Sequence, residues 1–174
     1  MDKLLIEGQQ SLSGSVRVSS AKNSVLPMLC ASVMVTDKSV TLENIPHLQD
    51  VTTTTRLLTQ MGMSVVMDEF MNINLNPETL DNFYAPYDLV KTMRSSILVL
   101  GPLLTRFGEA KVSLPGGCAI GMRPVDLHID ALKKMGAEID VSNGYIHAKT
   151  KKLIGTKIVF PTKTVTGTEN IIMA

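Results

Sequence analysis

The sequence predicts an α/β protein built from repeated units of helices and strands. Short strand-like runs alternate with helix-like runs along the 174 residues. The ends of two predicted helices also match in sequence. Residues 58–65 and 132–139 share a leucine, a Met-Gly pair and a β-branched final residue. Each copy follows an aspartate that begins a helix, and each leads into a pair of strands. Such self-similarity is typical of repeated structural units.

A second correspondence indicates where these units begin. Residues 14–22 and 155–163 both start with glycine, place valine at the fifth position and end with lysine. We therefore expect a first unit at about 14–80, a second at about 85–150 and a third from about 155. Because the chain stops at Ala174, inside an apolar helix-like run, we expect it to be the N-terminal part of a longer protein.

The individual elements follow from hydrophobic periodicity and from capping residues. Ser19 or Ser20 is expected to cap the first helix, and Pro27 is tolerated near its start. Gly62 and Gly136 are typical helix stops. The predicted helices are 21–35, 50–62, one that begins at Asp88, and 126–136. The predicted strands are 16–18, 40–45, 64–67, 71–75, 111–114, 138–141, 145–148 and 157–160.

Composition excludes several classes of protein. The chain has 17 Lys and Arg against 16 Asp and Glu, so a nucleic-acid-binding surface is not expected. A hydrophobic fraction of 44% argues against disorder, and no apolar run approaches the roughly 18 residues of a membrane span. The N-terminus lacks the apolar region of a signal peptide. Two cysteines in unlike contexts, Cys30 and Cys118, indicate no disulfide framework and a reducing cytoplasm.

Lys22 and Asn23 are the first candidates for ligand binding. They fall in the first turn of the first predicted helix, where a cation opposes the helix macrodipole. A bound anion would reverse that penalty, since free N–H groups and the lysine would both face it. From position alone, a solvated surface lysine is the better interpretation.

A glycine-rich loop supplies the second candidate. Residues 116–121 contain three glycines and Cys118, and Arg123 follows five residues after the cysteine. A nearby cation lowers the pKa of a thiol and raises its reactivity, which slightly favours function over an inward-packed turn. Cys30, flanked by Leu29 and Ala31, is expected to be inert core.

Arg94 and Asp126 each allow two interpretations. Arg94 borders the apolar stripe of its helix, so it either binds an anion or extends to solvent at the edge of the stripe. Asp126 suits a helix N-cap, a place from which it can also face a ligand. The three histidines show no metal-ligand spacing, so we expect neither a metal nor a cofactor.

Four segments then resemble a known family, namely 20–27, 85–94, 113–128 and 164–170. They are similar to the N-terminal part of the enolpyruvyl transferases, and within that family to the branch that acts on UDP-N-acetylglucosamine in bacterial peptidoglycan synthesis. The resemblance implies an inside-out α/β barrel of two domains, incomplete here. Residues 1–20 would belong to the other domain and 21–174 would form part of the first.

The resemblance also implies a reaction and the residues that perform it. Enolpyruvyl would pass from phosphoenolpyruvate to the sugar 3-hydroxyl, and phosphate would be released. Cys118 would protonate the methylene carbon and would be the target of the epoxide fosfomycin. Lys22 and Asn23 would hold phosphoenolpyruvate, with Arg94 and Arg123 adding positive charge. The nucleotide-sugar would be bound by Arg123, Pro124, Val125, Asp126 and Leu127 at the uridine, and by Lys163, Thr164, Val165 and Thr166 at the diphosphate.

Two departures from the family pattern limit this interpretation. Gln49 stands where the family often has lysine. The aspartate that serves as general base, and a further arginine, are expected in a C-terminal half that this sequence does not contain. Two alternatives remain open: the shikimate-pathway relative with the same fold, and a module that binds a uridine nucleotide without catalysis.

Overall fold

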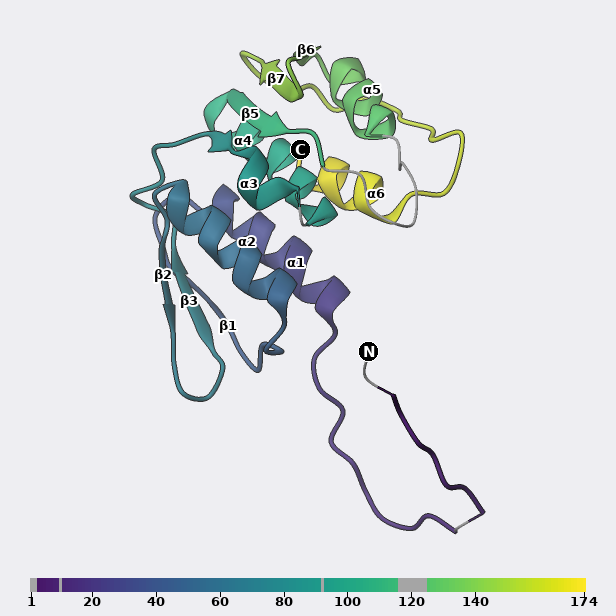
Figure 1. Cartoon of the computed structure of the whole chain (residues 1–174). Helices are drawn as coiled ribbons and strands as arrows, with labels where there is room; N and C mark the ends of the chain where they lie inside the picture. Colours follow the sequence, from purple (N-terminus) through teal and green to yellow (C-terminus); the bar gives the residue numbers. More distant parts are fainter. Residues whose placement is uncertain (1–2, 10, 92, 116–124) are drawn as a thin grey trace.

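A computed structural model describes residues 3–9, 11–91, 93–115 and 125–174, which form a helix-and-sheet body with an extended N-terminal arm (Figure 1). The α-helices are α1 (Lys22–Ala31), α2 (Gln49–Gln60), α3 (Tyr87–Val90), α4 (Leu100–Phe107), α5 (Asp126–Lys134) and α6 (Val165–Ile172), and the 3₁₀ helices are η1 (Ser32–Met34) and η2 (Arg94–Val99). The strands are β1 (Val40–Leu42), β2 (Ser64–Met67), β3 (Ile73–Asn76), β4 (Tyr84–Ala85), β5 (Glu109–Ser113), β6 (Glu138–Ser142) and β7 (Tyr145–Lys149).

The strands form two sheets. The first is antiparallel with the order β1-β3-β2, and the second has the order β4-β5-β7-β6 with one parallel pair, β4 and β5. Helices α1 and α2 lie side by side along the first sheet (Figure 1). Because strand side chains alternate between faces, Ile73 and Leu75 of β3 are fully buried. The α/β fold class is thus confirmed, and no closed barrel occurs among the residues described.

One apolar core joins the two sheets. Leu29 of α1, Leu57 and Leu58 of α2, and Leu100 and Leu103 of α4 all have no exposed surface and belong to the same cluster. Burial of large aliphatic side chains contributes about 1.5–3 kcal/mol each, so this shared core is the main force holding the helices in register. Ile171 of α6 packs against the same cluster, so α6 is joined to these helices as well.

The two helix ends that match in sequence are also built alike. Gly62 and Gly136 both have φ +97°, a left-handed conformation that glycine adopts without strain. The N–H of Met63 donates to Leu58 O at 3.1 Å, and the N–H of Ala137 donates to Leu132 O at 3.0 Å. Both ends are Schellman motifs, as the glycine stops predicted. The boundaries of the repeat units stay a prediction.

Several predicted elements are wrong. Residues 16–18 and 157–160 are extended but pair with no strand in the described part of the chain, and Val16, Val18 and Val159 are exposed. Neither segment can be a strand there, because a strand needs a partner for its backbone hydrogen bonds. The first helix is not capped by Ser19 or Ser20, since its N-cap is Ala21.

The third predicted helix is divided into α3, η2 and α4. Met93 is extended, with φ −141° and ψ 111°, which ends the helical run that began at Tyr87. Pro102 lies in the first turn of α4, directly after η2. Helix α4 follows η2 without a break, since Val99 and Leu100 both have right-handed helical backbone angles. No helix within the described ranges is both long and apolar enough to cross a membrane.

Candidate functional site

Two helix N-termini meet at one edge of the body. Helix α5 begins at Asp126 after Val125, and α6 begins at Val165 after Thr164. Their first turns are in contact, because His128 Nε2 lies 3.3 Å from Thr166 Oγ1. Helix N-termini carry unbonded N–H groups and a partial positive charge, so paired N-termini favour an anion. The contact brings together two segments that the sequence proposed separately.

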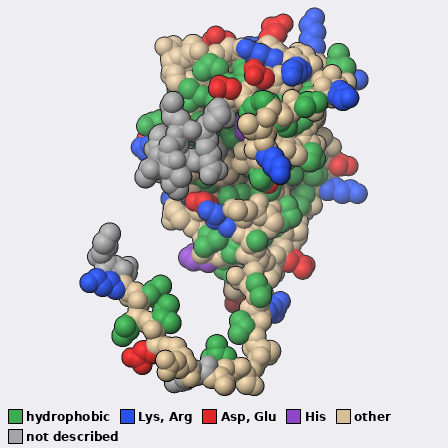
Figure 2. All heavy atoms as spheres, turned by 90° about the vertical axis from the view of Figure 1, so that its right-hand side faces the viewer, with side chains coloured by type: hydrophobic (Ala, Val, Ile, Leu, Met, Phe, Trp, Pro, Cys, Tyr) green, Lys and Arg blue, Asp and Glu red, His purple; other side chains and the backbone are tan. Residues whose placement is uncertain are grey.

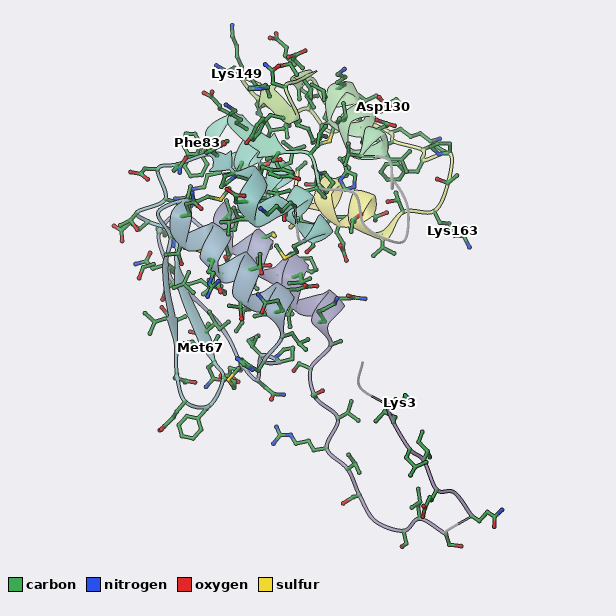
Figure 3. The ribbon with its side chains drawn as sticks, in the orientation of Figure 1. Lys3, Met67, Phe83, Asp130, Lys149 and Lys163 are labelled. Carbon is green, nitrogen blue, oxygen red and sulfur yellow. The ribbon has the colours of Figure 1, made fainter. Side chains whose placement is uncertain are left out.

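The start of α6 lines a hollow. Thr164 Oγ1 accepts a hydrogen bond from the N–H of Gly167 at 3.1 Å, which caps the helix. A Cβ at Gly167 would lie only 2.6 Å from Thr164 Cγ2, so this cap requires glycine. The open hollow beside it measures about 520 Å³ and is lined by Phe160, Pro161, Thr162, Lys163, Thr164, Val165 and Thr168. Lys163 extends outward from this segment (Figure 3).

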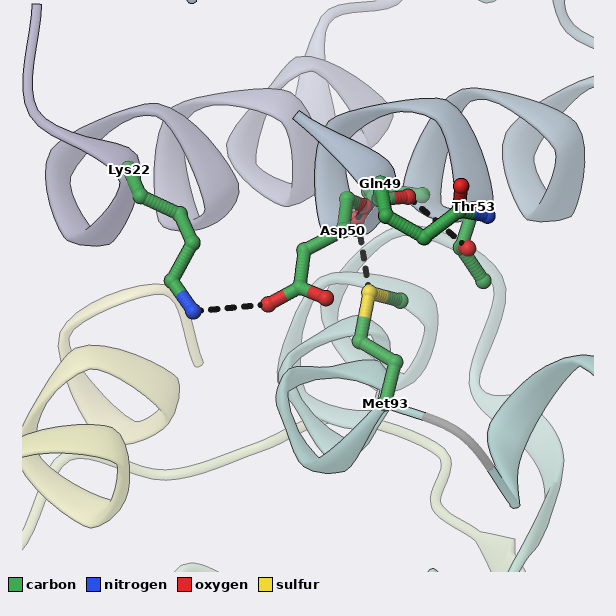
Figure 4. Close-up of polar contacts among 6 residues, drawn as sticks. Lys22, Gln49, Asp50, Thr53 and Met93 are labelled. Carbon is green, nitrogen blue, oxygen red and sulfur yellow. Dashed lines mark hydrogen bonds and ion pairs between the residues drawn. The ribbon is translucent and has the colours of Figure 1, made fainter. Parts of the chain in front are cut away.

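Lys22 forms an ion pair that sequence reasoning missed. Its Nζ lies 2.9 Å from Oδ2 of Asp50, across the gap between the first turns of α1 and α2 (Figure 4). Both side chains are partly exposed, so the pair contributes little to stability. Asp50 offsets the repulsion between Lys22 and the α1 macrodipole when no anion is bound. Nothing in the sequence signals a contact over 28 residues.

The neighbouring positions follow from the same arrangement. Asn23 is exposed beside Lys22, and Gln49 is exposed as the first residue of α2. The N-cap of α5 is Val125 rather than Asp126, which instead lies in the first turn together with Leu127. Asp126 thus acts through the helix dipole and not as a side-chain cap.

Some predicted residues cannot be placed. Cys118, Arg123 and Pro124 lie outside the described residues, and so does the side chain of Arg94. The backbone of Arg94 starts η2, an element that packs against both α1 and α6. On the face turned forward in Figure 2, basic and acidic side chains are interspersed and form no single patch. Among the described residues, no group of three or more potential ligands could hold a metal ion.

Comparison with known proteins identifies the family. The family model for EPSP synthase (3-phosphoshikimate 1-carboxyvinyltransferase) matches residues 6–174. The chain belongs to the EPSP synthase family. It is 56% identical over its whole length to a UDP-N-acetylglucosamine 1-carboxyvinyltransferase from Hydrogenovibrio crunogenus and 55% identical to one from Halorhodospira halophila. In both cases the chain spans 41% of the relative's length.

Solved structures support the fold of this family member. The enolpyruvyl transferase NikO from Streptomyces tendae matches with a TM-score of 0.68 and 22% identity, covering 82% of this chain and 31% of the other. The EPSP synthase from Acinetobacter baumannii matches with a TM-score of 0.71 and 17% identity, covering 92% of this chain and 38% of the other. The enolpyruvyl transferase fold expected from sequence is confirmed.

Cys30 differs from a reactive thiol in every respect. It lies in α1 with 1% of its surface exposed. Burial raises the pKa of the Cys30 thiol to about 12, with a further contribution from the charge of Glu169. The thiolate, which is the nucleophile, is therefore almost absent at neutral pH.

We expect limiting iodoacetamide to alkylate Cys118 and spare Cys30 in the folded protein. A thiol pKa near 12 reduces the thiolate fraction by roughly three thousandfold relative to an ordinary cysteine near 8.5. Peptide mass mapping measures both sites, and labelling in denaturant serves as the control because it should modify both. Preferential labelling of Cys30 without denaturant would contradict the prediction.

His128 is held in its neutral form. It is 4% exposed, its Nδ1 lies 3.0 Å from Asn170 Nδ2, and burial lowers the pKa of its imidazole to about 4. In the unfolded chain this imidazole takes up a proton at its ordinary pKa near 6.5. The stability linked to His128 is therefore complete above pH 6.5 and declines as the pH falls toward 4.

Replacing His128 by glutamine should flatten the loss of stability between about pH 6.5 and 4. The wild-type loss attributable to this group is about 3 kcal/mol. Urea unfolding at a series of pH values measures it, and His47→Gln, at an exposed position, is the matched control. An equal slope in His128→Gln and wild type would refute the assignment.

Proposed function

We propose that the complete protein carrying this chain transfers enolpyruvyl from phosphoenolpyruvate to the 3-hydroxyl of UDP-N-acetylglucosamine, with release of phosphate. The supporting observation is the contact between the first turns of α5 and α6, through His128 and Thr166, beside the hollow lined by Lys163. Paired helix N-termini and a lysine suit a diphosphate. The relatives at 55–56% identity are named for this reaction.

The proposed chemistry is addition followed by elimination. The sugar 3-hydroxyl would give its proton to the general base of the second domain as its oxygen adds to C2 of phosphoenolpyruvate, while the methylene carbon C3 takes a proton from the Cys118 thiol. The C2–O bond to phosphate then breaks, C3 gives up a proton, and the enol ether remains. Lys22, Arg94 and Arg123 would stabilise the anionic groups, and Asn23 would help to position phosphoenolpyruvate.

The remaining assignments belong to the same proposal. Val125, Asp126 and Leu127, with Arg123 and Pro124 before them, would bind the uridine, and residues 163–166 would bind the diphosphate. Residues 1–20 would pack on a second domain that supplies the general base. The protein would act in the cytoplasm in cell-wall synthesis, and thereby in cell shape and division, and fosfomycin would alkylate Cys118.

The chain alone should bind UDP-N-acetylglucosamine weakly and catalyse nothing. Its candidate site is open to solvent, so each charged contact is screened and contributes little. Titration calorimetry at about 0.05 M and 0.5 M salt should show affinity falling as salt rises. Lys163→Gln should weaken binding further, whereas Lys38→Gln, which removes the same charge from another exposed position, should not.

Phosphate release separates the candidate functions. The complete protein should release phosphate from phosphoenolpyruvate with UDP-N-acetylglucosamine as acceptor, and the present chain should not. Release with shikimate 3-phosphate instead would favour the reaction that the family model's name describes. Nucleotide binding by the complete protein without release from either acceptor would indicate a non-catalytic module. Tight, salt-insensitive binding by this chain would mean that the site is misplaced.

A further inference from the structure

A buried amide joins the two helices of the candidate site to the rest of the core. Asn170 of α6 has no exposed surface. Its Oδ1 accepts a hydrogen bond from the N–H of Gly101 at 2.7 Å, and its Nδ2 donates to Ile97 O at 3.0 Å. The same Nδ2 lies 3.0 Å from His128 Nδ1. One side chain thus links α6 to α5, η2 and α4.

These contacts determine which atom donates and which accepts in each hydrogen bond of the series that runs from Gly101 through Asn170 and His128 to Thr166. A backbone N–H can only donate, so the Asn170 atom facing Gly101 must be the oxygen and the other must be the NH₂ group. The NH₂ group donates, so His128 Nδ1 must accept. A neutral imidazole with an accepting Nδ1 carries its proton on Nε2. His128 Nε2–H then donates to Thr166 Oγ1 at 3.3 Å.

The hydrogen bonds end at Thr166 in the first turn of α6, next to the hollow. Because Thr166 Oγ1 accepts from His128, its own hydroxyl proton is left for another acceptor. The structure gives this hydroxyl no other hydrogen bond among the described residues. Thr166 is the second residue of α6, one position from Val165, which lines the hollow.

We propose that Asn170 is a positioning residue that sets the Nε2–H tautomer of His128 and thereby makes the Thr166 hydroxyl a hydrogen-bond donor to an anionic oxygen of the nucleotide diphosphate. The proposal rests on the proposed function for the identity of the ligand, but the hydrogen-bond chain is independent of it. Glycine at position 101 allows Asn170 to approach this closely, since a Cβ there would lie 2.5 Å from Asn170 O and Oδ1.

The tautomer of His128 can be measured directly on the 174-residue protein. Nitrogen-15 NMR of the imidazole should show the Nε2–H form of His128 near pH 7 and the Nδ1–H form in Asn170→Asp. In that variant the ionised carboxylate replaces the donor beside Nδ1 with an acceptor, so the imidazole turns its proton toward it, while Ile97 O loses its donor. An Nδ1–H form in wild type would overturn the proposal.

The effect on the ligand is measured with the complete protein. Thr166→Val should raise the KM for UDP-N-acetylglucosamine by about 10-fold or more and leave the KM for phosphoenolpyruvate unchanged, because a hydrogen bond to a charged oxygen is lost. Thr166→Ser should restore it. Thr59→Val, on an exposed part of α2 where the hydroxyl donates to Thr55 O, is the matched control.

The pH profile of Asn170→Asp distinguishes positioning from a structural role. At high pH the neutral imidazole of the variant accepts from Thr166 and takes its proton away from the ligand, so affinity should fall. As the imidazole becomes protonated, both nitrogens donate and affinity should recover.

An unchanged KM in Thr166→Val, or no pH dependence in Asn170→Asp, would refute the proposal. If wild type shows no turnover of UDP-N-acetylglucosamine, the proposed function fails, while an Nε2–H result would leave the hydrogen-bond chain standing.

Discussion

Replacing Lys22 by glutamine in the complete protein is expected to lower kcat/KM for phosphoenolpyruvate by about 10²–10³-fold. Lys22 lies in the first turn of α1, where its Nζ forms an ion pair with Oδ2 of Asp50 at 2.9 Å. A dianionic ligand would compete with that single carboxylate for the lysine. Removing the cation leaves the carboxylate of Asp50 unpaired beside the ligand, which adds repulsion to the lost attraction.

Asp50→Asn provides the comparison for Lys22→Gln. It should change kcat/KM only several-fold, because the pair is exposed and weak. Lys22→Arg should retain more activity than Lys22→Gln, since charge is kept but geometry is not. Steady-state kinetics with phosphoenolpyruvate as the varied substrate measures all three variants. Near-normal kcat/KM in Lys22→Gln would exclude Lys22 from the site.

Gly101→Ala is expected to destabilise the folded chain by about 3 kcal/mol. Gly101 lies in the first turn of α4, and an added methyl group would meet the backbone and side-chain oxygens of Asn170 at 2.5 Å. Helix α6 would have to move away, which breaks the buried hydrogen bond from the Gly101 N–H to Asn170 Oδ1. The cost therefore combines overpacking with an unsatisfied polar group.

Urea unfolding followed by circular dichroism measures the cost of Gly101→Ala. Gly155→Ala is the matched control, because no atom lies within 4 Å of the added Cβ and no left-handed backbone is involved. The control should match wild type within about 0.5 kcal/mol. Equal stability of Gly101→Ala and wild type would show that α6 does not pack against α4 in this way.

Local features of the fold were predictable from sequence, and partners distant in sequence were not. Strand β2 has the predicted bounds, and Gly62 and Gly136 end their helices as expected, because both signals are contained within a few residues. Residues 157–160 have the composition of a strand but no partner strand among the described residues. Composition reports propensity, whereas pairing depends on the rest of the fold.

Part of the candidate site could be proposed from sequence. The motifs proposed Lys22 and residues 163–166, and the structure places His128, the residue after 125–127, against Thr166. Asp50, Asn170 and the role of His128 could not be predicted, since each depends on a contact between residues distant in sequence. His128 is one of three histidines without ligand spacing, and only its burial against α6 distinguishes it.

The extended arm at residues 3–9 and 11–20 also determines how the chain responds to denaturant. Its side chains at Leu4, Leu5 and Ile6 are 84–93% exposed already in the folded state. The slope of unfolding free energy against urea concentration scales with the surface newly exposed, and this segment exposes almost none. The chain should therefore unfold with the urea dependence of residues 21–174 alone, and deleting the arm should leave both the slope and the midpoint unchanged.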